Sequence, residues 1–273
     1  MRTVFGSWKY IFKNLWFVLP FSVVPAVFMA LSLDYDRISV VVRGFFTGAP
    51  QAGFLDFFHA WSFFRFDSVL GVIYSAIAVV GIIFFMAALI AFVEKHMRLG
   101  KRTLSGVGAQ FFNALPSAAF VTLAYLVFYE IWAVVLSAVL YVISQVDIVA
   151  VVYVLYIAAV LLFLFVLVYL ATVLYLWLPC KLMTGFRFFE AFLYSYRLMV
   201  ERRWKLVLSF AISAAAMLVV IGVSVFLPDP AFHVIGAALF LLLFPNFCVR
   251  MEVVYFEGDK LDREDELHSY RRY

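Results

Sequence analysis

The chain has 273 residues, of which 67% are hydrophobic and 14% are charged, and its formal net charge is +4. Soluble domains contain about 45–50% apolar and about 25% charged residues, so a water-soluble fold could not bury this much apolar surface. At about 20 residues per membrane crossing, the length allows roughly six or seven spans and excludes a sizeable soluble catalytic domain. The expected fold class is all-α: a polytopic transmembrane helical bundle, with residues 1–273 as a single integral membrane domain.

Long apolar runs without internal charges predict the membrane spans in chain order. The runs lie at about 15–33, 69–93, 115–143, 148–179, 205–227 and 231–249. The first run is about 19 residues long, nearer to a full span than to the apolar part of a signal peptide, which has about 7–15 residues. We therefore predict that this run is a membrane helix and not a cleaved leader.

Lysine and arginine are distributed unevenly between the two sides of this six-span arrangement. Of the 21 such residues, three (Arg37, Arg43 and Arg65) fall on one side and the other eighteen fall on the opposite side, which also carries both termini. Cytoplasmic loops are enriched in these residues. The pattern predicts three hairpins with both termini in the cytoplasm, and 257–273 as a short cytoplasmic tail.

The connection at 38–66 differs from an ordinary hydrophilic loop. Its aromatic residues recur at nearly helical spacing: Phe54, Phe57, Phe58, Trp61, Phe64 and Phe66. This spacing predicts an amphipathic helix lying in the external membrane interface. A re-entrant segment, or a lid over a cavity, is the alternative. The candidate functional residues of this loop are Asp56, His59, Trp61 and Arg65.

Metal, cofactor and disulfide chemistry find little support in the sequence. Asp56 and His59 could share a helix face and begin a metal site, but the remaining histidines are scattered along the chain. We predict no metal site, no cofactor and no nucleic-acid partner. Cys180 and Cys248 both fall near cytoplasmic helix ends, where thiols stay reduced, so no disulfide is expected.

Glu130 is the candidate functional residue within the membrane. It lies inside the third predicted span, where a carboxylate is costly and often functional. No lysine or arginine interrupts any predicted span, so we expect the neutral acid, hydrogen-bonded to a Tyr, Ser or Thr of a neighbouring helix. Two roles remain open: a proton or cation site, or a polar contact that joins two helices.

Basic residues beside the predicted spans act first as topology signals. They are also candidate contacts for the headgroups of anionic membrane lipids: Arg98, Lys101, Arg102, Arg202, Arg203 and Lys205.

Two stretches carry a resemblance to a known family. One is the aromatic stretch Phe186–Trp204, which follows Leu178-Pro179, and the other is Arg250–Glu257 with the charged residues after it. Together they resemble bacterial six-span membrane proteins of unknown function, the YesL-like and YciC-like sequences, which are related to membrane domains that accompany glycerophosphodiesterases. The resemblance implies a six-span protein of the bacterial cytoplasmic membrane and brings no catalytic residues.

Three classes of function remain open on the sequence. Without paired intramembrane charges or a recognised catalytic motif, the sequence favours a non-enzymatic accessory, scaffold or regulatory component of a membrane complex. Its expected partners are membrane lipids and a membrane protein. The alternatives are a transporter or channel subunit that uses Glu130 and a lipid-active membrane enzyme. The sequence indicates neither a substrate nor an oligomeric state.

Overall fold

The computed structural model describes residues 2–47, 52–99, 107–184, 186–200 and 203–270. Within these ranges the regular structure is entirely helical, which confirms the predicted fold class. The helices are α1 (Arg2–Lys13), α2 (Leu15–Val18), α3 (Pro20–Leu31), α4 (Tyr35–Thr47), α5 (Phe54–Trp61), α6 (Val69–Leu99), α7 (Val107–Ser144), α8 (Val149–Leu174), α9 (Trp177–Thr184), α10 (Phe188–Met199), α11 (Arg203–Ser224) and α12 (Asp229–Tyr270).

Five of the described helices are long and apolar enough to cross a membrane: α6, α7, α8 (continuing into α9), α11 and α12. They indicate an integral, multi-pass membrane protein. α7 has 38 residues, about 57 Å at about 1.5 Å per residue, which exceeds a hydrocarbon core of about 30 Å. This helix is therefore longer than one perpendicular crossing requires.

The first predicted span, 15–33, is divided between α2 and α3. α3 is a shorter apolar helix of 12 residues that begins at Pro20. Proline has no backbone N–H to continue the hydrogen-bond ladder of a preceding helix, but it fits the first turn of a new one. The short α2 therefore ends just before Pro20, and α3 starts at it.

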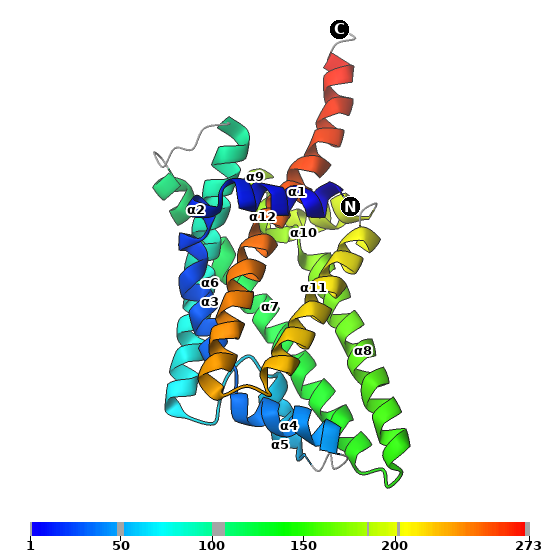
Figure 1. The fold of residues 1–273 in the computed structure, drawn as a ribbon. Coiled ribbons are helices and arrows are strands. Elements are labelled where there is room, and N and C mark those ends of the chain that lie inside the picture. The colour runs from blue at the N-terminus through cyan, green and yellow to red at the C-terminus, as the bar shows by residue number, and fades with distance from the viewer. Residues whose placement is uncertain (1, 48–51, 100–106, 185, 201–202, 271–273) are drawn as a thin grey trace.

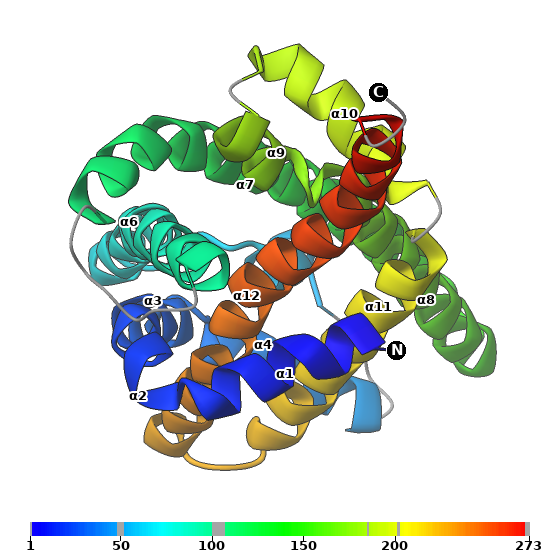
Figure 2. The same cartoon turned by 90° about the horizontal axis from the view of Figure 1, so that it is seen from above.

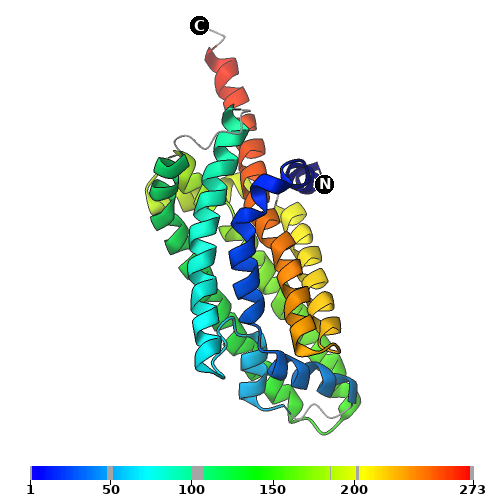
Figure 3. The same ribbon diagram turned by 60° about the vertical axis from the view of Figure 1, so that its left-hand side comes forward.

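Six helices form a closed ring. Each of α3, α6, α7, α8, α11 and α12 contacts the next one around the ring, with α7 and α8 joined to α6 on one side and to α11 on the other. Figure 3 shows α6, α3, α12 and α11 side by side, with the α7–α8 hairpin behind them. Because the ring is closed, its centre is enclosed by helices on every side.

Shorter helices cover the two ends of the ring (Figure 1). α1, α9 and α10 lie at the end where the C-terminal part of α12 projects, and α4 and α5 lie at the other end. The predicted single amphipathic helix within 38–66 is thus a pair of helices followed by a loop, and Phe64 and Phe66 belong to that loop. α12 continues through residues 257–270 to Tyr270, so the predicted tail is helical over these residues.

The largest cluster of buried residues in the described part of the chain lies at the end of the ring covered by α1, α9 and α10. There α12 crosses the ring and contacts α6 as well as its neighbours α3 and α11. Figure 2 shows α1 lying across α12 at this end. Leu89, Ile90, Leu176, Leu178 and Val249 are among the buried residues of this core. The ring is consequently solid at this end and hollow towards α4 and α5.

Candidate functional site

Glu130 holds the loop that follows α5. Its Oε2 accepts a hydrogen bond from the Ser62 hydroxyl at 3.0 Å, and its Oε1 accepts one from the Phe63 backbone N–H at 2.9 Å. We call Ser62, Phe63 and Glu130 the latch. The partner of Glu130 includes a serine, as expected, but this serine belongs to the loop at 62–68 and not to a neighbouring membrane helix. The two candidate sites predicted from the sequence, Glu130 and the aromatic loop, are therefore one site.

The same loop is fixed to α6 a few residues later. The Arg65 N–H donates to the Ser75 hydroxyl at 3.1 Å, and that hydroxyl donates to the Gly71 carbonyl at 2.9 Å. A non-helical loop inside a helical bundle must find partners for its backbone N–H groups. Side chains of α6 and α7 supply these partners, so the loop has one defined position.

Aromatic rings next to the latch join α5, α7 and α8. The Tyr129 hydroxyl donates to the Trp61 carbonyl at 2.8 Å, and the Trp132 Nε1–H donates to the Phe163 carbonyl at 2.7 Å. The rings of Trp61 and Trp132 meet edge to face at 5.9 Å. Such pairs contribute about 0.5–1.5 kcal/mol beyond the area they bury. The end of α5 is thus tied to α7 through its backbone, its ring and the latch.

A central cavity of about 540 Å³ occupies the hollow part of the ring. All six ring helices contribute to its wall, and Ser62 and Phe63 of the latch line it beside residues of α4 and α5. The wall is mostly apolar. Thr122 is one of its few polar side chains, and its hydroxyl has no hydrogen-bond partner in the described part of the chain. The volume and the apolar lining are typical of a ligand-binding cavity.

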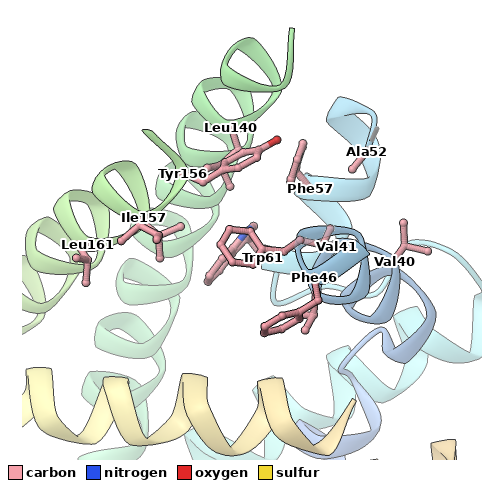
Figure 4. Close-up of a pocket in the computed structure, with 13 residues that line it drawn as sticks. Val40, Val41, Phe46, Ala52, Phe57, Trp61, Leu140, Tyr156, Ile157 and Leu161 are labelled. Carbon is pink, nitrogen blue, oxygen red and sulfur yellow. The ribbon is translucent and has the colours of Figure 1, made fainter. Parts of the chain in front are cut away.

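A side groove of about 350 Å³ lies beside the central cavity, between α4, α5, α7 and α8. Figure 4 shows its lining side chains. Its base is buried, with Phe57 and Leu140 almost inaccessible, whereas its rim is open, with Phe46 70% and Leu161 61% exposed. Val41, Val42 and Trp61 line both spaces. Trp61 therefore stands on the boundary between the groove and the central cavity.

The remaining candidate residues of the 38–66 segment make contacts within the α4–α5 region. Asp56 forms an ion pair with Arg37 of α4, and its other oxygen accepts from the Gly53 N–H at 2.9 Å. His59 packs its ring against Phe66. Asp56 thus fastens α5 to α4, and among the described residues no three metal-ligating side chains come together.

Asp34 caps the start of α4 in a buried position. It is 3% exposed, and its Oδ1 accepts from the Arg37 N–H at 3.1 Å. Its Oδ2 is buried without a hydrogen-bond donor in the described residues. Burial raises the pKa of Asp34; the Arg37 N–H and the charges of Arg65 and Arg37 oppose this rise, whereas the nearby charge of Asp67 adds to it. Because the folded chain then holds this proton more tightly than the unfolded chain, the stabilisation from Asp34 is present at low pH and is lost as the pH rises through the folded pKa.

We expect Asp34→Asn to raise the melting temperature at neutral pH, because the amide keeps the acceptor for the Arg37 N–H and removes a buried charge. The gain should shrink as the pH falls towards the ordinary carboxyl value of 3.8. Thermal unfolding in detergent across this pH range measures it. Asp67→Asn is the matched control: burial raises the pKa of Asp67, but the hydrogen bond and charge of Arg65 outweigh burial and lower it. That variant should lose stability at neutral pH. A change in melting temperature in the same direction for both variants would contradict this expectation.

The candidate headgroup contacts are described only in part. Lys101, Arg102, Arg202 and the side chain of Arg98 lie outside the described residues. Lys205 is exposed. Arg203 begins α11, donates to the Tyr169 hydroxyl at 3.1 Å and lies over the Tyr196 ring at 4.9 Å. Arg203 therefore helps to join α11 to α8 and α10, beyond any contact with lipid.

Arg250 is a functional candidate that sequence reasoning missed. It directly follows the last predicted span, 231–249, but it lies inside α12 and is 2% exposed. Its Nη1 donates to the Ser209 hydroxyl of α11 at 2.7 Å, and its guanidinium lies over the Phe210 ring at 5.2 Å. The sequence does carry a signal that Arg250 lies inside a helix. The apolar residues on both sides of it continue the hydrophobic pattern of the preceding span. The arginine joins α11 and α12 near the solid end of the ring.

Comparison with known proteins adds no further evidence on function. No family model matches the chain, and searches of curated proteins and of solved structures found no match. The latch, the cavity and the groove are the structural features that bear on function.

Proposed function

We propose that the chain is a non-enzymatic, multi-pass protein of the bacterial cytoplasmic membrane, and an accessory, scaffold or regulatory component of a membrane complex. The latch is the observation that carries this proposal. Both carboxylate oxygens of Glu130, the candidate intramembrane ion site, accept hydrogen bonds from one loop. This use of a membrane carboxyl fits a structural contact between segments better than an exchangeable ion site.

The proposed topology has six crossings, with α2 and α3 together as the first. α3 runs from the end that carries α1 to the end that carries α4, beside α6 and α12 (Figure 1). Most lysines and arginines of the described residues belong to segments at the end with α1, α9 and α10, whereas Arg37, Arg43 and Arg65 belong to segments at the other end. By the positive-inside rule, this end is cytoplasmic. The resemblance to six-span bacterial proteins supports the same arrangement.

Reporter fusions test this topology. We expect a reporter at the C-terminus to read as cytoplasmic and one inserted in the turn between α7 and α8, after Val146, to read as external. A matched insertion after Arg102, on the opposite side, should read as cytoplasmic. An external reading at the C-terminus would overturn the even number of crossings.

Purification in a mild detergent from the native membrane tests the accessory role. We expect mass spectrometry to find a second membrane protein in stoichiometric amount, which is absent when an unrelated multi-pass protein with the same tag is purified. A chain that elutes alone, with no protein retained at any detergent concentration that keeps it folded, would overturn the accessory role.

A transporter or channel subunit is the second candidate function, and the central cavity is the observation that favours it. Ser62 and Phe63, the partners of Glu130, form part of the cavity wall. Release of the latch would therefore change the wall of the cavity beside α4 and α5. Uptake measurements on vesicles that contain the Glu130→Gln variant distinguish this role from a purely structural role of Glu130. A transporter that uses Glu130 should lose the coupling of uptake to the proton gradient in this variant.

A further inference from the structure

The central cavity and the side groove form one potential binding path. Val41, Val42 and Trp61 belong to the walls of both, so the two spaces lie on either side of these side chains. The groove leads from an open rim to a buried base, and the cavity extends from there between all six ring helices. A long, narrow molecule could lie in both spaces, whereas a compact one would use the cavity alone.

The position of the rim indicates which molecules reach this path. Ile157 and Leu161 of α8 and Val40 and Phe46 of α4 form the exposed rim. α8 is the most apolar of the candidate spans, and most of its side chains face outwards. In a membrane protein such a face lies against lipid hydrocarbon, so the groove opens sideways to lipid chains and not to water.

One polar group on the path restricts the occupant further. Trp61 Nε1–H is buried and has no acceptor within hydrogen-bonding distance among the described residues. The indole nitrogen only donates, and a buried donor without a partner costs free energy. A turn of the Trp61 ring towards an occupant with an acceptor oxygen would satisfy this donor, whereas a plain hydrocarbon would leave it unpaired.

We propose that the groove and the cavity bind one acyl lipid from the surrounding membrane. Its hydrocarbon chain lies in the central cavity, and an ester oxygen accepts the hydrogen bond from Trp61 Nε1–H. The site depends on the chain being in a membrane and is independent of whether a protein partner exists. A quinone, which also joins a carbonyl to an apolar tail, is the competing occupant that the experiment must exclude.

Gly222 gives a direct way to fill the cavity. It lies on α11 in the cavity wall, and a Cβ atom added there would meet no heavy atom within 4 Å. Gly222→Leu therefore places a side chain in the space proposed for the lipid chain, without a clash at Cβ. Gly108→Leu is the matched control, because Gly108 also has open space around it but is exposed near the start of α7 and is not part of the cavity wall. Leucine has a higher helix propensity than glycine, so neither variant should weaken its helix.

The experiment uses the full chain in vesicles of phosphatidylethanolamine that contain a phosphatidylcholine with a photoreactive diazirine in one acyl chain. After illumination, mass spectrometry maps the crosslinked peptides. We expect crosslinks in the part of α7 around Thr122 and Leu126, with a yield that falls at least about fivefold in Gly222→Leu and is unchanged in Gly108→Leu. Trp61→Phe keeps an aromatic ring, although a smaller one, and removes the donor, so it should lower the yield about threefold to tenfold.

Three results would overturn the proposal. The first is crosslinking confined to the outward face of α8 and insensitive to Gly222→Leu. The second is full retention of the phospholipid by Trp61→Phe, which would remove the assigned hydrogen bond. The third is a quinone that co-purifies with the unmodified chain in stoichiometric amount and is lost in Gly222→Leu, which would assign the site to a different class of ligand. Equal melting temperatures of the variants and the unmodified chain exclude misfolding as the cause.

Discussion

Replacing Glu130 by leucine is expected to destabilise the protein by about 2–4 kcal/mol, whereas replacing it by glutamine should change stability by less than about 1 kcal/mol. Leucine removes the acceptors for both the Ser62 hydroxyl and the Phe63 N–H. Glutamine keeps an acceptor oxygen for the Phe63 N–H. Its amide group can donate to the Ser62 hydroxyl, which in turn can donate to the Phe64 carbonyl at 3.1 Å. The unfolding midpoint in detergent of the three proteins measures the difference.

A second substitution separates the latch from a general effect of altering α7. In Ser62→Ala the Phe63 N–H keeps its carboxylate acceptor, but the hydrogen bond to Glu130 and the one from the Phe64 N–H are lost, so we expect a loss of about 1–2 kcal/mol. Combined with Glu130→Leu, Ser62→Ala should cost less than it does alone, because the bond to Glu130 is already broken and only the bond from the Phe64 N–H remains to be lost. Additive losses in the double variant would show that the two side chains act separately and would contradict the latch. A strong loss of stability in Glu130→Gln would instead indicate that a charged carboxylate is required.

Gly71→Ala is expected to destabilise the protein by about 1–3 kcal/mol, although alanine is normally the better residue in a helix. A Cβ atom at this position would lie 2.6 Å from Arg65 Cγ and 2.8 Å from the Arg65 carbonyl oxygen. The long side chain could move, but the carbonyl belongs to the loop backbone that the latch and Ser75 hold in place. Relief of the overlap therefore requires the loop to shift.

Gly108→Ala is the control for this substitution, because its added methyl group meets nothing within 4 Å. It should be neutral or stabilising by up to about 1 kcal/mol. Unfolding midpoints measure both variants, and the labelling rate of a cysteine placed at Phe64 reports movement of the loop. An unchanged midpoint and labelling rate in Gly71→Ala would show that the loop is not held tightly against α6.

The amino-acid sequence was sufficient to determine the fold class and the positions of most long helices. Membrane helices are local in the chain: an apolar run of sufficient length forms a helix because lipid offers no partner for its backbone groups. For this reason α6, α7, α8 and α11 lie close to the runs predicted for them. The division at Pro20 and the extension of α12 past Glu257 were not predicted, because both depend on local backbone propensity, and hydropathy does not report that property.

Some residues of the candidate site could also be predicted from the sequence. Glu130 and Trp61 can be recognised in the sequence, because a carboxyl group inside a predicted span and a connection rich in aromatic residues are both unusual. Their association was not predictable, since Ser62 and Glu130 are 68 positions apart. Nor was the role of Arg250, because a count of charges near span ends cannot distinguish an arginine in a tail from one that is buried against a neighbouring helix.

The sequence by itself thus determined that this chain is a membrane-embedded helical protein and identified two of its unusual features. Only the tertiary structure decided that the ring of six helices closes around a cavity, that the loop after α5 enters the ring, and that Glu130 holds it there. The physical reason is the range of the interactions. Transfer of an apolar run into lipid depends on the run alone. A cavity, a latch and a sideways opening depend on which faces of distant helices meet, and that is fixed by packing and hydrogen bonds between segments far apart in the chain.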